Sequence, residues 1–559
     1  MTTDQTSGTL LVGPLLRRIA GTKATIWVET AHAAEVEVRA GDAGGHATTF
    51  SAFGHHYALV VVEGLEPGSA TPYDVYVGGE HVWPLADSPY PRSIIRTRGT
   101  ADAETQAKLV FGTCRETTQH ATTRRLPPDA LDAYARRLMR NEGDPEAWPD
   151  MLVLLGDQVY ADKTSPTVRQ QLKARRLPHH GLQDDVQTFD EYTKLYLESW
   201  RDPEIRWLFS TVPSVMMFDD HEIIDDWNSS AAWRADMQRE PWWAERISNG
   251  LASYWVYQHM GNLAPDELDA DALYPKVASA GDATEVLREF AERVDKEADF
   301  GHLPESWKSR QYQWSFAIDL GRTRLVVLDN RCSRVLDPDH RAMLPSAEWS
   351  WFLSQAHGTT FDHLVVGSSL PWLMPPAIHH LEAWNERISA SKRPRVAAFG
   401  EKLRRLVDLE HWAAFQTSFE AMADLFRVIG RSSDGPASIS VLSGDVHHSY
   451  VARAELGRDI PTPVHQLTCS PIHNQVPSFM RPLMRIGWSG WAAVIARGMA
   501  AMTGVRTPSL RWHKSGDGPY FGNAIATLTH RGLEARVTIE GTTPGGELDT
   551  VTDVALTTR

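Results

Sequence analysis

The first hundred residues alternate apolar and polar positions in short segments rich in Val, Ile, Thr and Tyr, a pattern typical of β-strands. Glycine and proline separate these segments at short intervals, which favours an antiparallel β-sandwich. The expected strands cover residues 23–30, 34–41, 57–65, 73–80 and 92–99. A polar stretch over residues 99–105 follows and is interpreted as a linker.

From about residue 109 the pattern changes, because apolar strands now alternate with long stretches of helical periodicity. The expected strands cover residues 109–113, 151–157, 214–220, 324–330, 363–369 and 438–445. The helical stretches cover residues 127–140, 186–200 and the region 233–300, and residues 523–541 resemble a β-hairpin. Strand–helix alternation predicts an α/β layered domain whose sheet is buried on both faces.

These two patterns divide the chain into a β-sandwich over residues 1–100 and a larger domain with a C-terminal extension over residues 106–559. Residues 486–505 are the most apolar later stretch, but Arg497 and Gly498 interrupt it. A bilayer span needs about 20 apolar residues, so this stretch predicts a buried helix. The N-terminus shows neither a signal peptide nor a leading twin-arginine motif, so a cytoplasmic protein is expected.

Composition narrows the possible functions. A length of 559 residues suggests two to four domains. The net charge of −15, from 56 Lys+Arg and 71 Asp+Glu, disfavours binding to nucleic acid through its backbone, but not binding to metal cations. Cys114, Cys332 and Cys469 are few and odd in number, which fits a reducing compartment rather than a disulfide framework. The sequence leaves the oligomeric state open.

Five of the expected strands end in residue types that bind metals or phosphate. These ends are Cys114-Arg115, Gly156-Asp157 with Tyr160, Asp219-Asp220-His221-Glu222, Asp329-Asn330-Arg331 and Gly444-Asp445-Val446-His447. Each alone is adequately explained as a turn or a structural residue. Since ligands collect at the carboxyl ends of strands in open α/β sheets, five such ends together predict one shared site.

The sequence around these ends resembles the alkaline phosphatase D (PhoD) family of calcineurin-like metallophosphatases. The matching motifs are FGTCR (111–115), GDQVYAD (156–162), FDDHE (218–222), LDNR (328–331) and SGDVHHS (443–449). The resemblance implies a four-layer α-β-β-α sandwich with a fibronectin-III-like N-terminal domain, to which residues 65–68 and Tyr73 add a weak match to a tyrosine corner. It further implies hydrolysis of phosphate esters with one ferric ion and one or two calcium ions; Zn, Mn or Mg stay possible.

The resemblance assigns the metal ligands residue by residue. The thiolate of Cys114 and the phenolate of Tyr160 suit Fe(III). Asp157 would bridge to a second metal, which Asp220 would also bind. Asp225 stands where the family commonly has an asparagine, and its carboxylate still offers oxygen to a cation.

The remaining assignments concern the hard cation and the phosphate. Asp445 and His447 would bind metal, with the aspartate favouring calcium. His221 would lie near the phosphate and protonate the leaving oxygen. Arg331, and less clearly Arg115, would hold phosphate oxygens with the guanidinium fork.

By the same resemblance, a metal-bound hydroxide would attack a small phosphate-ester substrate in line. Monoesters and diesters, including lipid or nucleotide diesters, both remain open, because family members with these motifs vary. The family's WDGY motif appears only as Trp-Asn-Glu-Arg at 384–387, which also leaves the substrate range open. The alternative is a catalytically weak metal- or phosphate-binding module that retains the fold.

Overall fold

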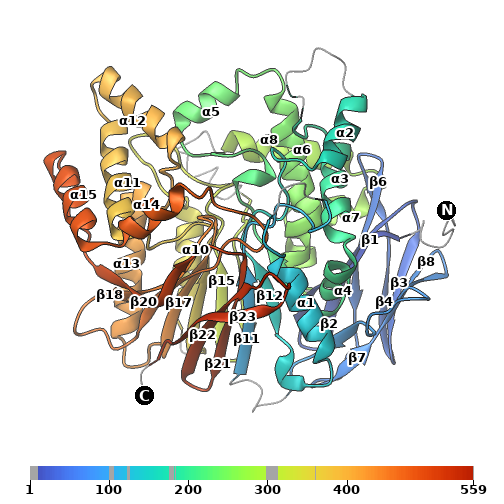
Figure 1. Ribbon diagram of the computed structural model, residues 1–559. Helices are drawn as coiled ribbons and strands as arrows, with labels where there is room; N and C mark the ends of the chain where they lie inside the picture. The colour runs from blue at the N-terminus through green and yellow to red at the C-terminus, as the bar shows by residue number, and fades with distance from the viewer. Residues whose placement is uncertain are drawn as a thin grey trace.

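The computed structural model describes residues 10–99, 106–121, 126–175, 182, 184–297, 312–358 and 360–557. Figure 1 shows a β-rich N-terminal domain beside a larger body, in which helices flank central strands. Most of the expected linker at 99–105 lies outside the described residues. The chain thus has a mixed α/β fold with several sheets.

The N-terminal domain contains two four-stranded sheets and one strand pair. One sheet has the order β1 (Leu10–Ala20), β2 (Lys23–Thr30), β6 (His55–Val62), β5 (Phe50–Ala52); the other has β4 (Ala43–Thr48), β3 (Glu35–Ala40), β8 (Asp74–Val77), β9 (Glu80–Trp83); and β10 (Ile94–Arg96) pairs with β7 (Ala70–Pro72). Ile26, Val38 and Val60 belong to the shared apolar core of this domain. The expected β-rich character of the region is therefore confirmed.

The tyrosine-corner prediction for Tyr73 is wrong. Its buried hydroxyl donates at 2.6 Å to the carbonyl of Ser210 in helix α4 (Pro203–Thr211), which belongs to the larger body of the chain. A buried hydroxyl needs an acceptor, and here the neighbouring helix supplies it instead of the strand connection. Tyr73 therefore connects the two parts of the chain.

Among the described residues, the larger body contains two central sheets. Strand–helix alternation alone suggested one sheet, whereas the family resemblance implied two. The six-stranded sheet has the order β13 (Ser214–Met216), β12 (Met151–Leu154), β11 (Gln106–Gly112), β21 (Ala524–Arg531), β22 (Glu534–Thr542), β23 (Leu548–Ala555). The seven-stranded sheet has the order β14 (Phe316–Leu320), β15 (Thr323–Val327), β16 (His363–Gly367), β17 (Ser438–Ser443), β19 (Val464–Thr468), β18 (Ser449–Glu455), β20 (Arg511–Tyr520). The predicted hairpin at 523–541 is confirmed as β21–β22.

Helices lie outside both sheets (Figure 1). They are α1 (Ala130–Arg140), α2 (Pro166–Arg175), α3 (Phe189–Trp200), α4, α5 (Ala231–Met237), α6 (Trp243–Tyr254), α7 (Tyr274–Ser279), α8 (Thr284–Glu297), α10 (Ser346–Ala356), α11 (Pro376–Ser389), α12 (Pro394–Leu406), α13 (Gln416–Arg431), α14 (Met480–Gly487) and α15 (Gly490–Met502). The expected helical stretches at 127–140 and 186–200 are α1 and α3. Thr188 and Glu191 start α3 with a reciprocal capping box, which satisfies two backbone donors.

Three apolar cores hold these layers together. Residues of both sheets share one core, which includes Phe111, Val153, Leu325, Val365 and Leu442. Alternate residues of the same strands contribute to two further cores, with α1, α3 and α4 on one side and with α10 and α13 on the other. Because β12 and β16 are buried on both faces, their sequences, MLVL and HLVVG, are almost continuously apolar.

The prediction of a buried helix at 486–505 is wrong. The stretch spans the end of α14 and all of α15, and the side chains of Val494 and Ile495 are 70% and 64% exposed. Trp488 and Ser489 separate the two helices. No helix in the described ranges is both long and apolar enough to cross a bilayer.

The N-terminal domain is joined to the larger body by buried polar contacts. The guanidinium of Arg17 donates to the carbonyls of Ser214, Tyr257 and Gln258 at 3.0, 2.9 and 2.7 Å. The indole of Trp27 donates to the carbonyl of Val256 at 2.9 Å. These donors satisfy carbonyls that no water reaches, so the two parts pack as one body.

The two central sheets also meet through a histidine pair, which predicts acid sensitivity. His363 of β16 and His530 of β21 stack at 3.9 Å, and burial lowers the pKa of both below 6.5. Neutral rings therefore stabilise the fold above pH 6.5, and this contribution is lost as the pH falls below it, by about 1.4 kcal/mol per unit of lowered pKa. The thermal midpoint of wild-type protein should fall between pH 7.5 and 5, and H530Q should reduce this pH dependence.

The matched control is H357Q, because His357 is an exposed histidine at the end of α10. It should show the wild-type pH dependence. Equal acid sensitivity in H530Q and wild type would refute a contribution from the stacked pair.

Candidate metal centre

Unusual backbone geometry marks the strand ends that carry the candidate ligands. Cys114, Asp157, Asp445 and His447 have φ angles of 61°, 52°, 61° and 49°, in the left-handed region that non-glycine residues seldom adopt. Each such residue costs about 1–3 kcal/mol, and such residues cluster at functional sites. The turns therefore hold these side chains in place at a cost in stability.

One buried carboxylate joins the turn at Asp157 to the segment that follows β13. Glu222 closes the short 3₁₀ helix Asp220–Glu222 that follows β13. Its carboxylate accepts backbone N–H bonds from Asp157 at 3.2 Å, Gln158 at 2.7 Å and Asp219 at 2.9 Å. The strand ends of β12 and β13 are thereby fixed relative to each other.

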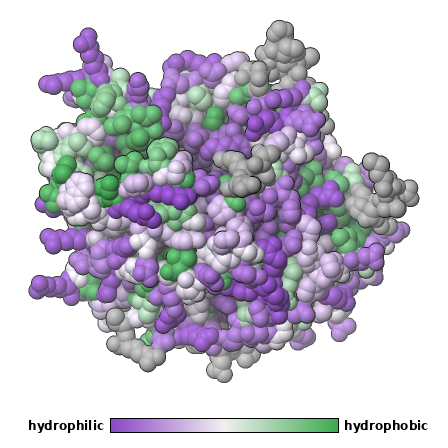
Figure 2. All heavy atoms as spheres, in the orientation of Figure 1, coloured by the Kyte–Doolittle hydropathy of each residue, from purple (hydrophilic) through white to green (hydrophobic). Residues whose placement is uncertain are grey.

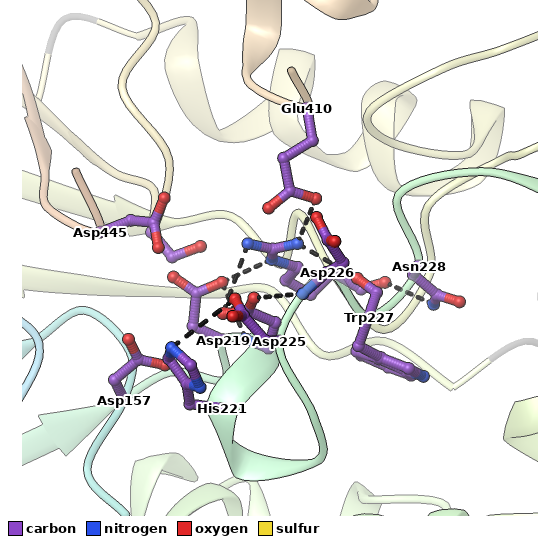
Figure 3. A network of polar contacts seen from close by, with 12 residues as sticks. Asp157, Asp219, His221, Asp225, Asp226, Trp227, Asn228, Glu410 and Asp445 are labelled. Atoms are coloured by element: carbon purple, nitrogen blue, oxygen red, sulfur yellow. Dashed lines mark hydrogen bonds and ion pairs between the residues drawn. The ribbon is translucent and has the colours of Figure 1, made fainter. Parts of the chain in front are cut away.

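Four buried or half-buried carboxylates converge at these ends. Asp157, Asp219, Asp220 and Asp445 each offer an oxygen, and these oxygens lie within 4.8 Å of one another. Figure 3 shows Asp157, Asp219 and Asp445 facing the same space. Burial raises the pKa of Asp157 and Asp219 well above the usual range and that of Asp220 to about 6.

The donor atoms of this carboxylate cluster fit a hard cation. Within the described residues, Oδ1 of Asp157, Oδ2 of Asp219 and Oδ1 of Asp220 are buried and accept no hydrogen bond. A buried carboxylate oxygen without a donor is costly, and a cation that prefers oxygen ligands removes that cost. The cluster therefore offers carboxylate oxygens whose lone pairs are available to a metal ion.

Arg331 lies behind the carboxylate cluster and is held by acidic partners. Its Nε donates to Asp219 at 2.5 Å, and its Nη1 donates to Glu410 at 2.6 Å. Its Nη2 lies 3.6 Å from Asp220, and the side chain is completely buried. The positive charge thus offsets part of the acidic charge at the centre.

His221 lies beside the carboxylate cluster and belongs to a second group of possible metal ligands, with Asp162 and Asp225. One of its ring nitrogens lies within 4.8 Å of oxygens of Asp157 and Asp220. Its Nδ1 lies 2.9 Å from Asp162, and its ring stacks on Tyr160 at 4.3 Å. Burial alone would raise the pKa of Asp162, but His221 lowers it to about 2.

Asp225 belongs to this second group and not to the carboxylate cluster. Its side chain is 58% exposed, and its Oδ1 lies 3.8 Å from Nε2 of His221. A ligand atom of Asp162 completes the group. Lys163 also approaches, with its Nζ at 3.2 Å from Nε2 of His221.

Cys114 and Tyr160 both lie near Asp157. Ser470 donates to the Cys114 sulfur at 3.3 Å, and Tyr160 donates to Oδ2 of Asp157 at 3.2 Å. Asn474 donates to the Tyr160 oxygen at 2.9 Å. Burial and the Asp157 carboxylate raise the pKa of both groups, so each needs an adjacent cation to ionise near neutral pH.

The last strand end supplies Asp445 and His447. Nε2 of His411 lies 3.4 Å from Asp445, and Nδ1 of His411 lies 2.8 Å from Glu382. The backbone N–H of His447 donates to Ser470 at 3.2 Å, and burial lowers the pKa of its imidazole to about 3. His447 is thus neutral, the form that binds metals, although it stands outside the carboxylate cluster.

Arg115, which was predicted to hold phosphate oxygens, points away from the carboxylate cluster. Its Nε donates to Asp129 at 2.8 Å, and its Nη1 donates to Ser199 at 2.7 Å. Asp129 is the N-cap residue of α1. The buried guanidinium therefore connects α1 to α3, and its donors point away from the carboxylates.

Sequence reasoning missed several residues of the centre. Asp219 and Asp162 lie inside the quoted motifs FDDHE and GDQVYAD, where a second carboxylate was the available signal. Glu410 and His411 follow no strand, so no local pattern marks them. They become visible only through their contacts with Arg331 and Asp445.

The fold of this chain resembles that of a solved structure, PhoD. A solved structure of PhoD superposes with a TM-score of 0.60 at 12% sequence identity, covering 100% of this chain and 92% of that chain. A structure of the purple acid phosphatase PPD1 from yellow lupin (Lupinus luteus) seeds gives a TM-score of 0.48 at 9% identity, covering 97% and 74%. No curated protein matches the chain.

Family models divide the chain much as the fold does. A domain of unknown function, DUF7800, matches residues 7–95. The model of the PhoD-like phosphatases matches residues 130–536, which carry every ligand of the carboxylate cluster. This match spans well over half of the chain, which therefore belongs to the PhoD-like phosphatase family.

Proposed function

We propose that this protein hydrolyses phosphate esters with cations held by Asp157, Asp219, Asp220 and Asp445. The observation that carries the proposal is the set of buried carboxylate oxygens that accept no hydrogen bond. Family membership supports the reaction class. The cations would neutralise charge on the phosphate oxygens and lower the pKa of water.

We assign the remaining side chains to supporting roles. Cys114 and Tyr160 would complete a site for Fe(III), because thiolate and phenolate suit that ion. Asp445 and His447 would bind a calcium ion. Asp225 would bind a cation weakly, since it is exposed.

His221 would hold the proton that the leaving oxygen requires. Burial and Lys163 lower the pKa of His221, but the Asp162, Asp220 and Asp157 carboxylates raise it well above 6.5. Asp162 fixes the orientation of the ring through Nδ1. We also propose that the layers form an α-β-β-α sandwich and that the N-terminal domain is fibronectin-III-like.

Removing metal should abolish hydrolysis and lower thermal stability. Without cations, the buried carboxylates repel one another, whereas a cation at 100 times its Kd stabilises a fold by about 2.7 kcal/mol. Chelated protein should therefore lose activity and melt at a lower temperature, and metal should restore both. An unchanged melting temperature and activity after chelation would refute the metal centre.

Elemental analysis with a visible spectrum identifies the cations. Near-stoichiometric iron and calcium, with a charge-transfer band, would support the roles of Cys114 and Tyr160. Zinc, manganese or magnesium alone would retain the phosphatase and exclude the iron site. Assays with bis-p-nitrophenyl phosphate and p-nitrophenyl phosphate separate diester from monoester activity, and metal binding without hydrolysis of either ester would favour the binding module.

A further inference from the structure

An apolar surface lies on the helix pair α14–α15, which we define as residues 479–502. Seven of the thirteen exposed large apolar side chains among the described residues belong to it: Phe479, Leu483, Ile486, Trp491, Val494, Ile495 and Met502. Their exposed fractions range from 42% to 83%. Figure 2 shows hydrophobic residues gathered at the upper left, where Figure 1 places α12, α14 and α15.

The neighbouring helix α12 enlarges this surface. Phe399 and Leu406 on α12 are 57% and 72% exposed, and Val407 directly after it is 49% exposed. Soluble monomers rarely expose a continuous apolar patch of this kind, so such a patch marks an interaction surface.

The helix pair is rigidly anchored although its outer face is bare. Gly487 lies against Pro375 and Ile378, where a Cβ would meet side-chain atoms at 3.0 Å. The ring of Trp488 contacts that of Tyr450 at a centroid distance of 5.1 Å. These contacts hold the helix pair in place, so its apolar side chains keep a fixed position on the surface.

The charge around the helix pair is opposite to that of the whole chain. Residues 475–510 contain Arg481, Arg485, Arg497 and Arg506 and no acidic residue, while the chain carries −15. Lys392, Arg393, Arg395 and Lys402, on or next to α12, are also exposed. The apolar face is thus bordered mainly by cations, and Glu401 and Asp408 are acidic residues on or next to α12.

A cationic groove of 920 Å³ adjoins the helix pair through Arg497. Arg453, Arg458 and Arg511 also line it, together with His380, and Glu455 is its acidic lining residue. Guanidinium groups at this density form an attractive site for phosphate groups. The groove therefore gives the adjacent surface a preference for anions.

We propose that the helix pair and the cationic groove dock on the surface of an anionic phospholipid bilayer. Exposed Trp, Phe and aliphatic side chains enter the boundary between headgroups and acyl chains, and arginines bind the anionic headgroups. A second copy of this chain fits less well, because a symmetric contact would bring the arginines of both copies together.

Docking would bring the metal centre close to the bilayer. Asn474, which donates to the Tyr160 oxygen, lies five residues before Phe479. The proposal goes beyond phosphate-ester hydrolysis, since binding to lipid requires no turnover.

Sedimentation of the metal-loaded full chain with vesicles tests the proposal. Binding to phosphatidylcholine vesicles containing about 30% phosphatidylglycerol should exceed binding to pure phosphatidylcholine by about tenfold or more. I495E and W491E should each reduce binding by about tenfold, because a charge then enters the interface. R497Q combined with R511Q should reduce the preference for the anionic vesicles.

The matched control is L533E, at an equally exposed leucine in the β21–β22 turn. It should bind vesicles like wild type, and all variants should hydrolyse a soluble ester at the wild-type rate. Absence of vesicle binding, or undiminished binding by I495E, would overturn the proposal without affecting the proposed phosphatase. A dimer that I495E dissociates, without vesicle binding, would instead assign the surface to a second copy.

Discussion

Replacing Asp157 with asparagine should lower kcat for phosphate-ester hydrolysis by about 10³-fold and leave the protein folded. The substitution keeps the shape of the side chain and removes the charge from the oxygen that accepts no hydrogen bond. It also removes one of four mutually repelling carboxylates. The chelated variant should therefore melt no lower than chelated wild type, whereas added metal should stabilise it less.

The matched control is D319N, because Asp319 forms a partly exposed ion pair with Arg324 on the strands β14 and β15. Its kcat should equal that of wild type. Hydrolysis that survives D157N unchanged would remove Asp157 from the proposed cation site, and metal content measured on both proteins would show whether a cation is still bound.

Replacing Arg331 with methionine should destabilise the fold by about 3–5 kcal/mol. Arg331 is completely buried, and its loss leaves Asp219 without its arginine and Glu410 with Arg334 alone, at 3.2 Å. The midpoint of denaturant unfolding should fall accordingly. Adding D219N to R331M should recover part of the loss, because one uncompensated charge is then removed.

R140M controls for the loss of any arginine. Arg140 and Glu547 form an exposed pair at 2.6 Å, and such pairs contribute about 1 kcal/mol or less. R331M protein as stable as R140M protein would show that the buried pairs do not support the fold.

The clustering of the carboxylates was predictable in part, because they directly follow apolar strands. Asp157 and Asp445 were expected at one shared site for this reason, although they follow β12 and β17, which belong to different sheets. The choice of Asp220 over its neighbour Asp219 was incomplete, because residue pattern alone does not show that both carboxylates reach the same space. Arg115 follows a strand too, but it forms an ion pair with Asp129, the N-cap residue of α1, instead of facing the carboxylates.

The pairing of the strands was not predictable. Periodicity shows that a segment is a strand without showing its partner, so the assignment of each strand to one of the two sheets escaped prediction. The pairing of β11 with β21 joins segments more than 400 residues apart, and no local pattern encodes it. The exposure of α15 escaped for a similar reason, because hydropathy indicates a need for apolar contact without showing whether the chain itself provides it.

The buried bonds of Arg17 and Trp27 have a consequence for how such a protein can evolve. A gene fragment starting near residue 106 would encode a body whose Ser214, Tyr257 and Val256 carbonyls have lost their donors. In the N-terminal fragment alone, the arginine side chain would lose the carbonyls to which it donates. Neither part is therefore a cassette that recombination can exchange freely, and the two are expected to be inherited and to diverge together.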